Sequence, residues 1–185
     1  MKILGLDIST SITGVCVLEY QKDIVVDPKI ILIDKIEFKT CKTFWEKVDY
    51  SKEYFCSKEF IDATKNLDHI FIEESLQSFR SGMSSALTLT TLTKFNSLLS
   101  YLVREQFKKD PEYVSATSAR KQCGIKIQKT SLIGKNAKEQ SFEWAAAGPL
   151  KDYPWPLKKN GVPKDWAKDA TDAYIVARSG INKYK

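Results

Sequence analysis

Asp7 is the first residue of the sequence whose type and position indicate chemistry. It ends an apolar segment that begins at residue 3, and a turn rich in serine and threonine follows it. An ionised carboxylate at the end of a buried strand costs several kcal/mol unless a cation or hydrogen bonds compensate for the lost water. Two interpretations fit this position: Asp7 is a metal ligand, or it accepts hydrogen bonds from the turn amides of Ser9 and Thr10.

Other acidic residues stand in comparable places further along the chain. A second short apolar segment ends in Glu73 and Glu74. Successive side chains of a strand point to opposite faces, so only one of this pair can share a face with Asp7. Asp169 and Asp172 are three residues apart in a segment of helical periodicity, which puts both carboxylates on one face of a helix.

These carboxylates favour one class of chemistry if they meet in space. Hard divalent cations such as Mg²⁺ prefer carboxylate oxygens and keep positions open for water and phosphate. Two such ions, about 3.5 to 4 Å apart, can promote an in-line phosphodiester cleavage. The sequence has no cysteine and histidine spacing typical of zinc and no glycine-rich phosphate loop of the P-loop kind. Metal-assisted hydrolysis of nucleic acid is therefore the favoured class.

Composition supports a polyanionic partner. A chain of 185 residues fits one domain, 1–185, with a full core. The net charge is +6, and residues 104–138 alone carry nine basic and three acidic side chains. Such a region suits nucleic acid, although a solvated basic face is the alternative interpretation.

The sequence gives no indication of export or of a membrane span. Its first apolar segment stops at Asp7, the four cysteines have no CxxC spacing, and no segment reaches the ~18 apolar residues that a transmembrane helix needs. We expect a cytoplasmic protein with reduced thiols, or one in the host cytoplasm if a phage or virus encodes it.

Hydrophobic periodicity predicts an alternation of strands and helices. Strands are expected at residues 2–7, 14–18, 29–38, 69–73 and 112–115, the first three as an antiparallel meander. Helices are expected at 43–66 (whole or broken), 84–107, from 117 or 118, 136–147 after an Asn136–Glu139 capping box, and 164–178. Trp45 is expected in the core, and the lone His69 is expected to be structural. The proline-rich segment 149–163 is expected to be a loop, and no function is assigned to it.

Four segments, in this order, resemble the RuvC-type Holliday-junction resolvases of the ribonuclease H superfamily. They are ILGLD at 3–7 with Thr13-Gly14 after it, FIEE at 71–74, SALTL at 85–89 and KDATDA at 168–173. The resemblance spans nearly the whole chain. It implies an α/β, ribonuclease H-like fold with a five-stranded mixed sheet flanked by helices. It also implies a homodimer that nicks two opposed strands of a four-way DNA junction, and the helix at 84–107 is the expected interface.

The resemblance also implies roles for individual acids. Asp7, Glu73, Asp169 and Asp172 match the metal ligands, and two Mg²⁺ ions per active site are expected, with Mn²⁺ able to substitute. Glu73 matches better than Glu74, which is kept as the alternative ligand.

The family further implies lysines near the scissile phosphate and an aromatic side chain that stacks on junction bases. Lys138 is the best match for the lysine, with Lys135 beside it and Lys121 a weaker match; a solvent-facing Lys138 fits the sequence equally well. Phe79 lies in the loop where the aromatic is expected, and a packing role is its alternative. The side chains expected to contact DNA are Phe79, Arg80, Arg120, Lys121, Lys135 and Lys138.

Three other functions compete with junction resolution. A nuclease of the same fold could act on flaps, forks or RNA–DNA hybrids. The segment 5–11 also looks like the first phosphate motif of the actin and sugar-kinase ATPases, but those proteins need two such domains. A binding module without catalysis is disfavoured by the full set of acids.

Overall fold

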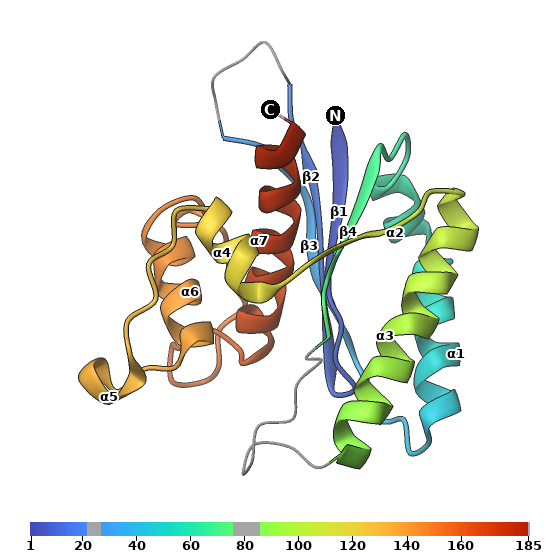
Figure 1. Cartoon of the computed structure of the whole chain (residues 1–185), viewed down its shortest axis with the longest axis horizontal. Helices are drawn as coiled ribbons and strands as arrows, with labels where there is room; N and C mark the ends of the chain where they lie inside the picture. Colours follow the sequence, from blue (N-terminus) through green and yellow to red (C-terminus); the bar gives the residue numbers. More distant parts are fainter. Residues whose placement is uncertain (22–26, 76–85, 185) are drawn as a thin grey trace.

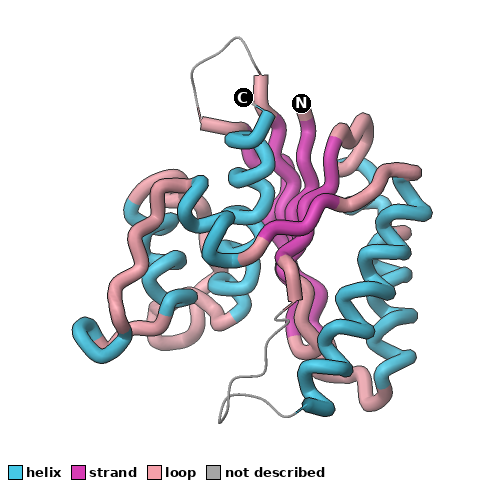
Figure 2. Tube along the Cα trace, viewed as in Figure 1, coloured by secondary structure: helices cyan, strands magenta, loops and turns pink. Residues whose placement is uncertain are grey.

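A mixed β-sheet forms the centre of the molecule. The structure, a computed structural model, describes residues 1–21, 27–75 and 86–184. The strands are β1 (Lys2–Asp7), β2 (Ile12–Glu19), β3 (Lys29–Glu37), β4 (His69–Glu73) and β5 (Glu112–Val114), in the order β3-β2-β1-β4-β5 (Figure 2). The first three pair antiparallel, and β4 and β5 continue the sheet in parallel with β1. The predicted five-stranded mixed sheet is confirmed.

Helices cover both faces of this sheet (Figure 1). On one face lie α1 (Phe44–Phe55), α2 (Lys58–Ala63) and α3 (Ala86–Phe107), and on the other lies α7 (Trp166–Tyr184). The helices α4 (Ala116–Gln122) and α6 (Ala137–Ala147) pack on α7, and α5 (Thr130–Ile133) lies further out. Among the described residues, no helix combines the length and the apolar character needed to cross a membrane.

The alternation of β1 divides the core in two. Leu4 and Leu6 pack with α1 and α3, whereas Ile3 packs with α7. Because strand side chains alternate, Asp7 faces α7, as Ile3 does. Strand β1 therefore contributes side chains to both cores and also places the buried carboxylate of Asp7 against α7.

Three glycines, Gly5, Gly14 and Gly180, let α7 lie unusually close to the sheet. A Cβ on Gly14 of β2 would come within 2.2 Å of the Asp169 carbonyl oxygen, and one on Gly180 of α7 within 2.6 Å of the Phe71 ring on β4. The helix thus crosses the sheet from β2 to β4. This close approach fixes the height of Asp169 above the strand ends.

The predicted elements recur with a few differences. The segment 43–66 is indeed a broken helix, and the capping box opens α6 as predicted. The last helix runs to Tyr184 rather than ending near Arg178, because Ile181 is buried and Gly180 packs on a ring. Helix α4 begins one residue early because Ser115 caps it, and the short α5 was not predicted.

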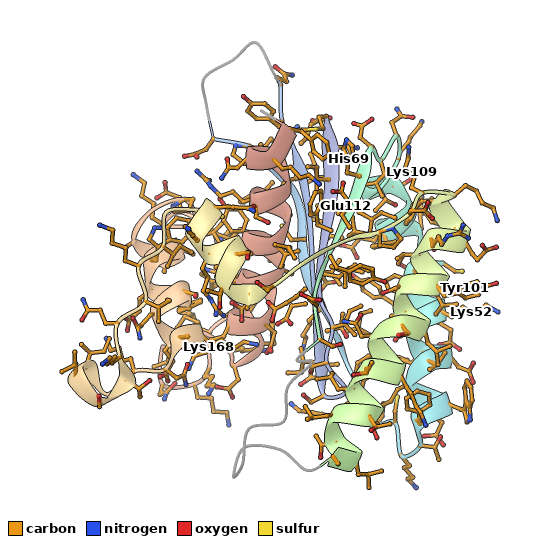
Figure 3. The ribbon with its side chains drawn as sticks, in the orientation of Figure 1. Lys52, His69, Tyr101, Lys109, Glu112 and Lys168 are labelled. Carbon is orange, nitrogen blue, oxygen red and sulfur yellow. The ribbon has the colours of Figure 1, made fainter. Side chains whose placement is uncertain are left out.

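Two residues that the sequence singles out lie outside the candidate site. The prediction that Trp45 belongs to the core is wrong. Trp45 is 64% exposed, because its helix turns only Val48, Ser51 and Phe55 fully inward. His69 starts β4, at the opposite end of the sheet from Asp7, where its ring stacks on Tyr184 at 4.2 Å. Figure 3 shows His69 next to Glu112, whose Oε1 lies 3.8 Å from the imidazole Nδ1.

Candidate active site

The ends of β1 and β4 bring the first two acids together. The parallel register pairs Leu6 with Ile72, so the next residues, Asp7 and Glu73, end neighbouring strands. Phe71 belongs to the core under α7, and Glu73, two residues later, faces the same way. Glu74 is exposed. Alternation along β4 thus puts Glu73, and not Glu74, on the face of Asp7.

Helix α7 adds the second pair of acids, and α6 adds a cation between them. The Lys138 Nζ lies 2.7 Å from Asp169 Oδ1, 3.2 Å from Asp7 Oδ2 and 3.3 Å from Asp172 Oδ2. Three predicted site acids from β1 and α7 therefore converge on one ammonium group. The sequence allows Lys138 either in this site or facing solvent, and in the structure it lies in the site.

The local sequence explains how α6 reaches this point. Asn136 Oδ1 accepts from the Glu139 amide, and Glu139 Oε2 accepts from the Asn136 amide, each at 3.0 Å. This capping box starts the helix just before Lys138 and so fixes its direction. Glu139 also accepts from Lys168 Nζ of α7 at 3.1 Å (Figure 3), which ties the two helices together beside the cluster.

Arg120 of α4 supplies a second cation from within the fold. Its Nη2 lies 3.4 Å from Asp172 Oδ1, and its Nε donates to Ser141 Oγ of α6 at 2.9 Å. The side chain is only 15% exposed. The sequence predicts Arg120 as a DNA contact, and in the structure its guanidinium lies against an acid of the site. Sequence reasoning missed this contact, as it missed Asn96 of α3, whose Nδ2 donates to the Glu73 carbonyl oxygen at 3.1 Å.

The cluster holds more negative charge than its cations balance. Burial raises the pKa of Asp7 to about 6, and the carboxylates of Asp172 and Asp169 add to the shift while Lys138 opposes it. Burial also raises the pKa of Glu73, which lies near Asp7, and that of Asp172. Burial lowers the pKa of Lys138, but the surrounding carboxylates outweigh this effect and keep the ammonium charged.

The donor chemistry of this cluster fits hard divalent cations. Its four carboxylates face two basic side chains, which leaves two negative charges unbalanced when all are ionised. All the candidate ligands are carboxylate oxygens, which Mg²⁺ and Mn²⁺ prefer. In the described part of the chain no three acidic, histidine or cysteine side chains already surround one point as ligands. The ammonium of Lys138 occupies the point at which three of these carboxylates converge.

The remaining predicted contacts lie elsewhere. Lys121 is exposed on α4, and Lys135 forms an ion pair with Glu143 at 2.5 Å just before α6. Part of the basic region is neutralised locally, since Arg104 pairs with both Glu105 and Asp110. Phe79 and Arg80 lie outside the described residues.

The sequence matches no protein-family model and no curated protein sequence. The fold does match solved structures along the full chain. Thermus thermophilus RuvC in complex with a Holliday junction substrate has a TM-score of 0.66 at 10% identity, over 100% of this chain and 95% of that one. The yeast mitochondrial Holliday junction resolvase has a TM-score of 0.59 at 16% identity, over 97% and 77% of the two chains.

A viral structure is similar in the same way. The fowlpox virus resolvase with its substrate Holliday junction DNA gives a TM-score of 0.56 at 17% identity, over 100% of this chain and 99% of that chain. At such identities the likeness establishes the arrangement of strands and helices.

Proposed function

We propose that this chain, which has the ribonuclease H-like fold of the RuvC-type resolvases, is a metal-dependent endodeoxyribonuclease. Its substrate would be a four-way DNA junction, cut by paired nicks, and residues 1–185 would form one nuclease domain. One observation carries the proposal: acids from β1 and α7 converge at one edge of this fold, beside Glu73 at the end of β4.

Asp7, Glu73, Asp169 and Asp172 are the proposed ligands of two Mg²⁺ ions. When bound, the ions supply the Lewis acidity that phosphodiester cleavage requires, and Mn²⁺ would substitute because it has similar oxygen preference. The unbalanced charge supports this assignment. So does the raised pKa of Asp7, which burial causes first and the carboxylates of Asp172 and Asp169 increase, because a bound cation would stabilise the ionised form.

Lys138 is the proposed electrostatic partner of the reacting phosphate. It holds its proton at Nζ in the carboxylate cluster, so it carries a full positive charge beside the position where the scissile phosphate would lie. A fixed cation of this kind stabilises negative charge that develops on phosphate oxygens in the transition state.

Arg120 is a proposed positioning residue. Its guanidinium is held between Ser141 and Asp172, so it limits the rotamers open to that acid. Lys121 and Lys135, with Phe79 and Arg80, remain proposed contacts to the arms of the DNA.

Paired nicking needs two active sites, and a homodimer would provide them. The outer side of α3 is the proposed interface. Its exposed side chains include Tyr101, which is 56% exposed (Figure 3), and Leu87, which is 76% exposed. Sedimentation of the chain with and without junction DNA tests this part, and a monomer under both conditions would contradict paired cutting.

The central experiment compares labelled substrates. A four-way junction, a fork, a flap, a linear duplex and an RNA–DNA hybrid are each incubated with Mg²⁺, with Mn²⁺ or with chelator. We expect metal-dependent, symmetric nicks in the junction. Preferred cleavage of flaps, forks or hybrids would assign the same active site to another substrate, and no cleavage of any of them would refute the nuclease function.

A further inference from the structure

An open groove of about 500 Å³ lies beside the candidate active site, at the edge of the sheet formed by β3. It lies between the end of this strand, the start of α7 and the proline-rich loop 149–163. Its charged lining consists of Lys35, Glu37, Lys39, Lys158, Lys164 and Asp165, and Ile12 and Trp166 complete it.

The strand register places this groove on the same face as the acids. Asp7 pairs with Gly14 of β2, and Gly14 pairs with Lys35 of β3. Side chains of directly paired residues project from one face of a sheet, so Lys35 faces α7 as Asp7 does. Two strand spacings separate their Cα atoms by about 10 Å. That distance places Lys35 within a few nucleotides of the acids along one DNA strand, since each nucleotide advances at least ~3.4 Å.

The loop 149–163 has a defined structure that forms one wall of the groove. Tyr153 Oη donates to the Ile33 carbonyl oxygen of β3 at 3.1 Å, which anchors the loop to the edge strand. The Trp155 ring packs on Tyr153 and on Trp166 of α7. Beyond this anchor the chain turns back on itself, with a bridge between residues 157 and 163. The turn holds Lys158 and Lys164 at the groove.

The groove carries more lysines than acids. Lys35 and Lys39 share the single carboxylate of Glu37, and Lys158 pairs with Asp165 at 2.6 Å. Within the described ranges no acidic partner lies near the ammonium of Lys164, whose backbone amide is held by Pro156. Exposed ion pairs are worth little. Lys39 and Lys158, whose side chains are exposed, can therefore exchange a carboxylate for a phosphate at low cost.

We propose that this groove binds the phosphodiester backbone of the substrate strand within a few nucleotides to one side of the scissile phosphate. The proposal rests on the nuclease function proposed above. It gives the proline-rich loop a role, which is to hold two lysines against the edge strand. The DNA strand would run from the carboxylate cluster past the first turn of α7 and across the end of β3.

The test combines a double variant with neutralised phosphates. Lys39→Ala/Lys164→Ala is made in an Asp7→Asn background, so that uncut junction can be titrated by fluorescence anisotropy in Mg²⁺ at several salt concentrations. We expect the slope of log affinity against log salt to fall by roughly one per lost phosphate contact, up to about two. The matched control, Lys52→Ala/Lys58→Ala, removes the same charge from α1 and α2 on the opposite face (Figure 3) and leaves the slope unchanged.

Methylphosphonates placed singly at the first four phosphates on each side of the nick locate the contact. They should weaken binding at one or two of these phosphates on one side in the background protein, and not further in the double variant. The groove is refuted if the double variant behaves as the control does in both measurements while the wild-type chain still cleaves. If the wild-type chain cleaves nothing but the double variant loses salt slope, the nuclease function fails and the groove stands. Circular dichroism and thermal unfolding verify that both variants fold.

Discussion

The ammonium of Lys138 lies 2.7 Å from the Asp169 carboxylate, inside the group of acids proposed to bind metal. It also reaches the buried Asp7 and Asp172, so one lysine serves as a counterion for three carboxylates. A divalent ion bound by the same oxygens would have to displace this ammonium. Lys138 would then be released toward the phosphate, which would link metal binding to the positioning of the proposed catalytic cation.

Replacement of Lys138 separates these two effects. Lys138→Met removes a positive charge that competes with the ions, so we expect affinity for Mn²⁺ without DNA to rise on the order of tenfold. Single-turnover cleavage should fall by roughly 10²-fold or more, because the cation at the transition state is lost. Calorimetry and quenched-flow assays measure the two quantities. Lys52→Met, which removes an exposed lysine of α1, is the control. Weaker metal binding by the Lys138 variant would contradict competition.

Asp7→Asn tests the proposed ligand at the end of β1. The amide keeps the shape of the side chain but removes the charge, so we expect cleavage to fall by about 10³-fold or more. Junction binding should stay within about threefold, since the DNA contacts proposed above lie on other side chains. Asp62→Asn, at an exposed position of α2, is the matched control. Cleavage at the wild-type rate by the Asp7 variant would remove Asp7 from the mechanism.

The sequence predicts those parts of the site that depend on local rules. Alternation along a strand puts Asp7 toward α7 and separates Glu73 from Glu74, and a capping box locates the start of α6 before Lys138. Each of these depends on residues within four positions of one another. The spacing of Asp169 and Asp172 is local in the same sense.

Contacts between distant segments could not be predicted in this way. Arg120 and Asp172 are 52 residues apart, and no local pattern marks an arginine that will be buried against an acid. The proline content of 149–163 predicts a loop but not that Tyr153 anchors it to β3. At the end of α7, Gly180 has the residue type of a helix terminus, yet it serves close packing on Phe71 and the helix continues.

Gly14→Ala tests whether the close approach of α7 positions the site. The added Cβ would lie 2.2 Å from the Asp169 carbonyl oxygen, so the start of α7 must move away from β2. We expect the free energy of unfolding to fall by about 1 to 3 kcal/mol. Cleavage should fall by up to about 10²-fold in protein that is still folded, because a displacement of 1 Å at Asp169 misplaces a ligand. Gly148→Ala, whose Cβ would lie 3.3 Å from its nearest neighbour, is the control, and equal behaviour of the two variants would refute the packing argument.

The raised pKa of Asp7 predicts how stability depends on pH in chelator. Its pKa is about 6 in the folded chain, against an ordinary value of 3.8, so the folded state binds the proton more tightly than the unfolded state. The resulting stabilisation is complete below pH ~4 and is lost as pH rises through 6. Denaturant unfolding from pH 4 to 7 should therefore show wild-type stability falling relative to Asp7→Asn, by an amount on the order of 2 kcal/mol.

The other ionisable groups either add to this pH dependence of stability or cancel in the comparison of wild type with Asp7→Asn. Glu73 and Asp172 face Asp7 and also have raised pKa values, whereas the carboxylates outside the cluster are the same in both proteins. Saturating Mg²⁺ should abolish the relative loss, because ions bind the ionised carboxylates and stabilise the folded state most at pH 7. The stability difference between wild type and Asp7→Asn could instead stay constant across this pH range, with and without Mg²⁺. That result would show that the folded cluster does not destabilise the ionised carboxylate of Asp7.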